Sequence, residues 1–199
     1  MSLTTLDIKE PGLNILPPGV ERHVVNAGGL TGLQIFPDDE IEIINDEGNQ
    51  ICEIICFNKD GKSDVGILNL KSNNKKNFIR NILNGKDETI LATNYQLKKR
   101  NLNISDSKSS IIFDPDTKAG ESMKFKSKDK CFAIFAAPGD DMDITNQNPP
   151  SDLTIFIKRF KIVNDKELNV IPDPVFEPLY EEDINKETSI FLSLSFFIL

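Results

Sequence analysis

The sequence predicts a mainly β fold of the α+β class: a β-sandwich or distorted barrel with two inserted helices, near residues 73–83 and 88–100. Three observations lead to this prediction. Short runs of alternating apolar and polar residues recur along the chain. Turn residues separate these runs, with 11 Gly and 11 Pro among the 199 residues. Between residues 73 and 100 the apolar spacing becomes helical. The length and the 39% hydrophobic content suit one domain with its own core.

Eight runs are predicted to be β-strands, most of them from alternation and flanking turn residues, and 50–57 and 131–137 from nearly continuous apolar runs. They are residues 22–26, 30–36, 40–44, 50–57, 109–113, 121–127, 131–137 and 153–160. Pro37-Asp38-Asp39 predicts a type I turn, because proline presets φ and the Asp side chains can accept hydrogen bonds from nearby amides. Residues 50–57 are apolar on both faces except at Glu53, which is typical of a central strand.

Two segments have helical periodicity instead. Apolar residues at positions 78, 79, 82 and 83 share one helix face and predict a helix over residues 73–83. A second helix is predicted over residues 88–100. It ends in three basic residues, 98–100, which favour the negative end of the helix dipole. A phosphate could bind there, but a solvated helix end is the favoured interpretation.

The chain is expected to contain a single β-rich domain over residues 21–171. An extended N-terminal arm (1–20) precedes it and an extended tail (172–189) follows it. The last ten residues, 190–199, contain eight apolar side chains, which is too short a stretch to span a bilayer. They suggest a truncated or frame-shifted reading frame whose end is not native to the fold.

Charge and cysteine content exclude several classes of function. The net charge of −8 argues against nucleic-acid and membrane partners, since both require a basic face. An odd number of cysteines and an N-terminus that does not resemble a secretory signal predict a cytoplasmic location. One histidine and the pair Cys52 and Cys56 do not complete a zinc site, so no metal or cofactor is expected. The GxSxG, Walker A, GxGxxG and HExxH motifs are absent.

Two stretches carry a family resemblance: Pro-Asp-Asp-Glu-Ile-Glu-Ile-Ile at 37–44, and Gly-Asn-Gln-Ile-Cys-Glu-Ile-Ile-Cys-Phe-Asn at 48–58. They resemble the hairpin of the urea-carboxylase-associated family, a domain of largely unassigned function. The chain is similar to the N-terminal part of marine bacterial proteins in which this domain precedes a folate-dependent aminomethyltransferase like the glycine-cleavage T-protein. The resemblance implies a second copy of the domain after a segment like 172–189. Many family members have Asp where this chain has Glu53.

The candidate ligand-binding residues are Gln50, Glu53, Asn58 and His23. Glu53 lies inside a predicted central strand, with Gln50 before it and Asn58 at the strand end. A buried carboxylate without a cationic partner has a raised pKa and can act as an acid or base. It can also accept two parallel N–H bonds from an amidinium-like ligand.

A structural role for the same residues is the favoured alternative. Glu53 would then pair with Arg22, Arg159 or a lysine across the sheet. Gln50 would satisfy backbone groups of the hairpin, and His23 would be a partly buried structural residue.

The expected function is a non-catalytic binding or assembly domain associated with aminomethyltransferase-type one-carbon or small-amine metabolism. It would form a homodimer, since a lone copy can pair with itself. It could contact an aminomethyltransferase domain or bind a small amine or amidine. The alternative is an enzyme subunit that acts on a small urea- or guanidine-like C–N compound, with Glu53 as the acid or base. No catalytic residue is assigned beyond that alternative.

Overall fold

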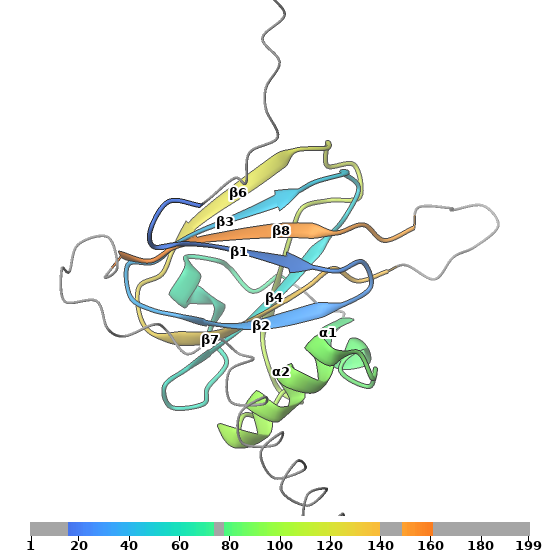
Figure 1. Cartoon of the computed structure of the whole chain (residues 1–199). Helices are drawn as coiled ribbons and strands as arrows, with labels where there is room; N and C mark the ends of the chain where they lie inside the picture. Colours follow the sequence, from blue (N-terminus) through green and yellow to red (C-terminus); the bar gives the residue numbers. More distant parts are fainter. Residues whose placement is uncertain (1–15, 74–77, 140–148, 161–199) are drawn as a thin grey trace, which may run out of the picture.

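The computed structural model describes residues 16–73, 78–139 and 149–160. Within these residues, eight strands form two four-stranded antiparallel sheets (Figure 1). The predicted mainly β fold is confirmed, as an open sandwich rather than a closed barrel. The predicted tail (172–189), the apolar end (190–199) and most of the predicted arm (1–20) lie outside the described residues.

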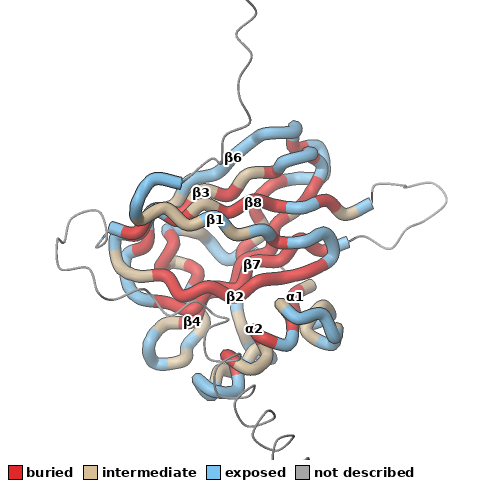
Figure 2. Tube along the Cα trace, viewed as in Figure 1, coloured by how far each residue is buried: buried red, intermediate tan, exposed pale blue. Residues whose placement is uncertain are grey.

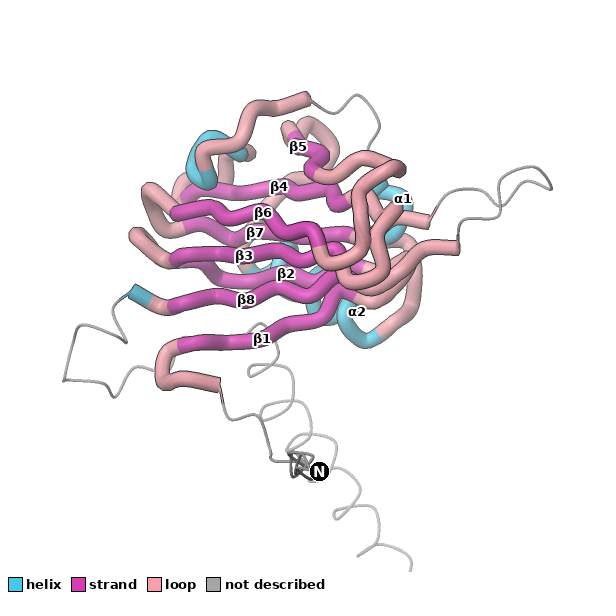
Figure 3. The backbone as a smooth tube through the Cα atoms, turned by 90° about the horizontal axis from the view of Figure 1, so that it is seen from above, coloured by secondary structure: helices cyan, strands magenta, loops and turns pink. Residues whose placement is uncertain are grey.

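The first sheet has the strand order β1-β8-β3-β6 and the second has the order β2-β7-β4-β5. The strands of the first sheet are β1 (Val20–Val25), β8 (Leu153–Lys158), β3 (Glu40–Asn45) and β6 (Glu121–Lys126). Those of the second are β2 (Leu30–Ile35), β7 (Cys131–Ala136), β4 (Cys52–Asn58) and β5 (Ser109–Ile112). The strands of both sheets run along a similar direction, as in an aligned sandwich (Figure 3). As predicted, β4 is a central strand, between β7 and β5.

The space between the sheets is filled by apolar side chains that alternate along the strands. Figure 2 marks the buried stretches of the two sheets in red. The buried apolar residues of these strands that face the other sheet include Val25, Leu33, Ile35, Ile41, Ile43, Ile54, Phe135, Leu153, Ile155 and Ile157. All six residues of β2 are buried, whereas the edge strand β6 is mostly exposed. The difference arises because β2 is covered on both faces, by the first sheet and by a helix.

The two helices are α1 (Phe78–Ile82) and α2 (Glu88–Lys99), and they lie beside the second sheet (Figure 1). The helix predicted over residues 88–100 is confirmed. The helix predicted over 73–83 is shorter than expected, and residues 74–77 lie outside the described part. A short 3₁₀ helix at Val65–Leu68 was not predicted. It starts where the Asp64 carboxylate accepts a hydrogen bond from the Gly66 amide at 2.9 Å.

The packing of α2 on the second sheet depends on Gly32 of β2. A Cβ atom at this position would lie 2.6 Å from the Phe132 ring and 3.2 Å from the Thr93 methyl group of α2. Any larger residue would therefore push the helix or the ring away. Gly32 pairs with Ile134, and Ile134 pairs with Ile55 on the next strand, so these three positions share the face that α2 covers.

The register of the second sheet divides this helix-facing surface into cross-strand rows. Residues two positions along each strand share the same face. On one side of the Gly32 row lies a row that we call the Glu53 row, made of Leu30, Ala136 and Glu53. On the other side lies a row that we call the Gln34 row, made of Gln34, Phe132 and Phe57.

The turn after β2 differs from the predicted type I. Asp38 has φ +66°, and the Asp39 amide donates to the Phe36 carbonyl at 3.2 Å. Positive φ at the third turn residue is the mark of a type II turn, and Asp tolerates this left-handed conformation better than most residues. The Asp39 carboxylate accepts a hydrogen bond from the Phe36 amide at 2.9 Å, as expected of an Asp in a turn.

Arg159, directly after β8, joins the two sheets at their β1 and β2 edges. It is 4% exposed. Its Nε and Nη2 each lie 2.7 Å from a different oxygen of Glu21 in β1, and its Nη1 lies 2.7 Å from Asp39. Nη1 also donates to the backbone carbonyl of Gln34 in β2 at 2.8 Å. One side chain therefore connects an edge strand of each sheet and the turn from β2 to β3.

We predict that Arg159→Met lowers the free energy of unfolding by about 3–5 kcal/mol, because it leaves two carboxylates without their buried cation. Lys158→Met is the matched control. Lys158 is the preceding residue, and it pairs with Glu40 at 3.6 Å in an exposed position, so its loss should cost less than about 1 kcal/mol. Urea unfolding of the three proteins measures the difference. Equal losses in both variants would contradict the role given to Arg159.

Candidate functional site

The Glu53 carboxylate lies beneath the start of α1. The residue is 0% exposed, and its Oε2 accepts a hydrogen bond from the backbone amide of Ile79 at 2.7 Å. A carboxylate at this position satisfies an amide of the first helical turn and suits the positive end of the helix. The two predicted arginine partners lie elsewhere, because Arg22 donates to Thr154 at 3.5 Å and Arg159 binds Glu21 and Asp39.

Gln50 and Asn58 satisfy the backbone at opposite ends of β4. Gln50 is buried, donates to the Pro138 carbonyl at 2.9 Å and accepts from the Ser151 amide at 2.8 Å. Asn58 Oδ1 accepts from the amides of Asp60 and Lys62 at 3.0 and 2.9 Å, which closes the turn after β4. In both cases the side chain binds backbone groups of the protein itself.

The four sequence-predicted residues do not converge on one cavity. Gln50 and Glu53 lie at the start of β4, and Asn58 lies at its end. Glu53 and Phe57 are four residues apart on the same face, or about 13 Å along the strand. His23 belongs to β1 of the other sheet. A ligand-binding role for the four residues, and an acid or base role for Glu53, therefore stay predictions.

His23 belongs to the cluster around Arg159. It is partly buried, and its Nε2 lies 3.1 Å from Glu21 Oε2. Burial by itself would raise the pKa of Glu21. Hydrogen bonds with His23 and Arg159, and the charge of Arg159, outweigh this effect and lower the pKa of Glu21 to about 2.

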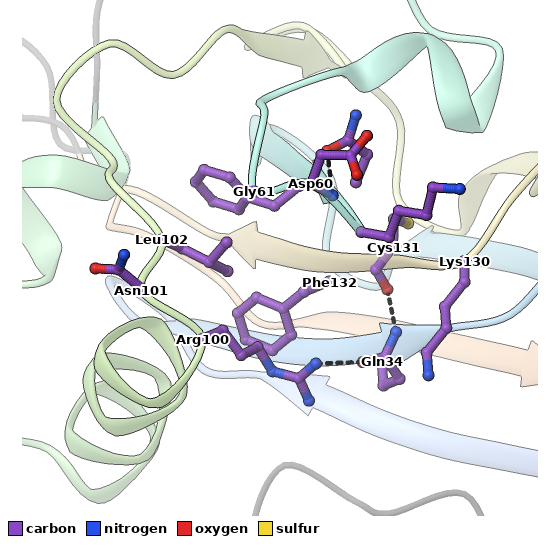
Figure 4. A pocket seen from close by; sticks show the side chains of 12 residues that line it. Gln34, Asp60, Gly61, Arg100, Asn101, Leu102, Lys130, Cys131 and Phe132 are labelled. Carbon is purple, nitrogen blue, oxygen red and sulfur yellow. Dashed lines mark hydrogen bonds between the residues drawn. The ribbon is translucent and has the colours of Figure 1, made fainter.

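Outside this cluster, the described residues contain a groove of about 440 Å³ where the end of α2 meets the Gln34 row (Figure 4). The buried aromatic residues Phe57 and Phe132 line it together with Leu102. Its polar residues come from four segments: Gln34 in β2, Asn58 to Gly61 after β4, Arg100 and Asn101 after α2, and Lys130 before β7. Of the predicted residues, Asn58 is the one that lines this groove. A groove of this size suits a small molecule.

Arg100 is held in a defined orientation at the groove. Its Nη1 donates to Gln34 Oε1 at 2.8 Å, and its Nε donates to Gln96 Oε1 at 3.2 Å. The guanidinium lies 5.2 Å from the centre of the Phe132 ring, a distance suited to a cation–π contact.

Gln34 is itself oriented by its surroundings. It is 7% exposed, and its amide nitrogen donates to the carbonyl of Cys131 at 2.6 Å (Figure 4). Since an amide has its donor and acceptor on opposite branches, this bond turns the Gln34 oxygen toward Arg100. The backbone carbonyl of Gln34 is the one that accepts from Arg159. The groove and the sheet-joining cluster therefore share this residue.

Sequence reasoning missed Gln34, Asp60 and Lys130, and it interpreted Arg100 as part of a solvated helix end. One signal was available, because the chain has four arginines among its 23 basic residues. A planar guanidinium is required where two acceptors must be bound in a fixed geometry. Both Arg100 and Arg159 occupy such positions.

Metal and thiol chemistry have little support in the part of the chain that the structure describes. There, no group of three or more His, Cys, Asp or Glu side chains converges as a set of metal ligands. Cys52, Cys56 and Cys131 are free and buried. Burial raises the pKa of Cys52. A hydrogen bond with Cys131 together with burial raises the pKa of Cys56, so both thiols stay protonated at neutral pH.

Comparisons with known proteins found a named relative and a similar solved structure. No family model matches the chain. Over 182 residues it is 31% identical to a Ruegeria pomeroyi protein named trimethylamine-oxide aldolase. The match covers 92% of this chain and 23% of that protein, so the chain spans about a quarter of its relative's length. A solved structure of a DUF1989 family protein from Silicibacter pomeroyi matches with a TM-score of 0.40 and 11% identity, over 74% of this chain and 82% of that one.

The chain is therefore a homologue of a protein named for an enzyme. This finding corrects the expected function: the prediction of a non-catalytic binding or assembly domain was wrong. The alternative, an enzyme subunit acting on a small C–N compound, agrees better with the relative's name. The Ruegeria protein is named neither for urea carboxylase nor for an aminomethyltransferase, so those finer resemblances stay predictions. Among the described helices, none is both long enough and apolar enough to cross a membrane.

We predict that Glu21→Gln changes the pH dependence of stability. Because the folded pKa of Glu21 is about 2 and its unfolded value is 4.5, its stabilisation is complete above pH 4.5 and is lost as the pH falls toward 2. The wild-type protein should exceed the variant in unfolding free energy at pH 6, and the gap should shrink steadily below pH 4.5. Urea unfolding at pH 6, 4.5 and 3 measures it. A gap that stays constant over this range would contradict the assignment.

Proposed function

We propose that this chain is part of an enzyme of small-amine metabolism that cleaves a C–N bond. We also propose that its substrate site is the groove of about 440 Å³ lined by Arg100. The observation that carries the proposal is the 31% identity over 182 residues to a protein named trimethylamine-oxide aldolase. The groove supports it, because it combines a positioned guanidinium with apolar walls at one place. The relative is about four times longer than the matched segment, so the reaction of this chain is itself part of the proposal.

The chemistry of an aldolase-type cleavage limits what such a site must do. For trimethylamine oxide the reaction balances as dimethylamine plus formaldehyde. The N–O bond, one C–N bond and one C–H bond of the same methyl group break, the released carbon forms a C=O bond with the oxygen, and the hydrogen passes to the nitrogen. That carbon is oxidised while the nitrogen is reduced, so no external oxidant is required. The site must therefore hold a small, methylated and strongly dipolar molecule in one orientation.

Three finer assignments accompany this proposal. The hairpin residues 37–44 and 48–58 support a relationship to the urea-carboxylase-associated family. The odd number of cysteines, all three free and buried, supports a cytoplasmic location. We also propose a homodimer, for which light scattering at micromolar concentration should give twice the mass of the 22.3 kDa chain.

We predict that trimethylamine oxide is converted to dimethylamine and formaldehyde either by the chain alone or by a chimera. In the chimera, the chain replaces the matching quarter of the Ruegeria protein. Proton NMR of the methyl signals follows both products. Arg100→Gln should lower the rate at least tenfold, whereas Arg22→Gln, on the exposed face of β1, should leave it unchanged.

Turnover by either protein supports the proposal. Absence of turnover in both, with a chimera shown to be folded by circular dichroism, overturns it. Glu53→Gln in the same assay tests the earlier assignment, because a loss of rate as large as that of Arg100→Gln would assign the reaction to Glu53 rather than to the groove.

A further inference from the structure

The groove differs in charge from the protein as a whole. The chain has a net charge of −8, yet the groove is lined by three cations, Lys59, Arg100 and Lys130, and by one carboxylate, Asp60. Lys130 is drawn toward the sheet, since its Nζ lies 5.3 Å from the centre of the Phe36 ring. A local excess of positive charge in an acidic protein attracts an anionic group to this place.

The guanidinium at this groove is positioned by its neighbours within the protein. The amide oxygens of Gln34 and Gln96 accept from Nη1 and Nε, and the Phe132 ring lies beside the guanidinium. Gln34 is in turn held by its bond to the Cys131 carbonyl. A guanidinium that is already oriented loses less conformational entropy when it binds an oxyanion than a mobile side chain does.

The carboxylate lies across the groove from this cation. Figure 4 shows Asp60 and Arg100 on opposite sides, with Leu102 and Phe132 between them. Asp60 belongs to the turn that Asn58 closes, where the Asp60 amide donates to Asn58 Oδ1 at 3.0 Å. The groove therefore presents the Arg100 guanidinium on one side, an apolar wall, and on the other side the Asp60 carboxylate, next to Lys59 in the same turn.

We propose that the groove binds small zwitterions in which an anionic oxygen lies close to an alkylated ammonium group. The oxygen, which is either the N–O oxygen of an amine oxide or a carboxylate, faces Arg100 and Lys130. The ammonium group faces Asp60, and its methyl groups contact Leu102 and Phe132. The choice of alkylated amines depends on the proposed function, whereas the separation of charge depends on the groove residues alone.

The test compares four compounds that divide the zwitterion into its parts. Trimethylamine oxide and glycine betaine carry both charges, trimethylammonium carries the positive one, and acetate carries the negative one. Each is titrated into the full ¹⁵N-labelled chain, and the signals of the Arg100 Nε–H and the Gln34 side-chain amide are followed. Thermal stability is a poor readout here, because amine oxides stabilise proteins generally by exclusion from their surface.

We expect at least one of the two zwitterions to bind at least tenfold more tightly than trimethylammonium and acetate. If only trimethylamine oxide does so, the anionic group is an N–O oxygen, and if only betaine does so, it is a carboxylate. Arg100→Gln should weaken binding of that zwitterion at least tenfold, and Arg100→Lys, which keeps the charge but loses the guanidinium, should weaken it less. Asp60→Asn should weaken the binding of the zwitterion but not the binding of acetate. Arg22→Gln, with an unchanged affinity, is the matched control.

Three results would overturn the proposal: no binding of either zwitterion, trimethylammonium binding as tightly as trimethylamine oxide and betaine, or equal effects of Arg100→Gln and Arg22→Gln. If Arg100→Gln fails to fold, Lys130→Gln and Asp60→Asn, both at exposed positions, carry the comparison. The outcome is independent of turnover. Binding without turnover would retain this site and reject the proposed reaction, while turnover without selective binding would do the reverse.

Discussion

The buried guanidinium of Arg159 is the interaction on which the arrangement of the two sheets depends. A sandwich of two open sheets leaves edge strands that must be held together where the apolar interior reaches solvent. Arg159 does this at the β1 and β2 edges, because it binds Glu21 of one sheet, the backbone of Gln34 in the other and Asp39 in the turn between them. Burial of three charged groups is costly, and it is compensated here by charge-assisted hydrogen bonds with good geometry.

The same constraint extends to the groove through Gln34. Its backbone is fixed by the sheet and by Arg159, and its side chain is fixed by the Cys131 carbonyl, so its oxygen has one direction in which to point. That direction sets the position of Arg100 at the end of α2. The guanidinium that lines the groove is thus positioned by residues that are themselves held by several hydrogen bonds, as a binding site requires. Glu53 has the corresponding role at the other end of the same face, where it holds the start of α1.

Local patterns predicted most of the fold. The alternation of residues gave the eight strands to within about two residues, and helical spacing gave α2, because burial on one face imposes a period that the chain itself must carry. The type of the turn at Asp38 was mispredicted, since Asp adopts both negative and positive φ and only the path of the chain between β2 and β3 selects one. The 3₁₀ helix at Val65–Leu68 was missed because a single turn is too short to show a period.

The sequence by itself determined the fold class, the central position of β4 and the scarcity of catalytic groups such as histidine. Tertiary structure alone decided which polar residues meet. Gln34, Asp60, Arg100 and Lys130 come from four separate segments, and no spacing along the chain indicates that they share a groove. It also decided that Glu53 contacts a helix amide rather than the predicted arginines. The physical reason is that hydrophobic periodicity is a local property, whereas the partner of a buried polar group depends on how sheets and helices pack across distant parts of the chain.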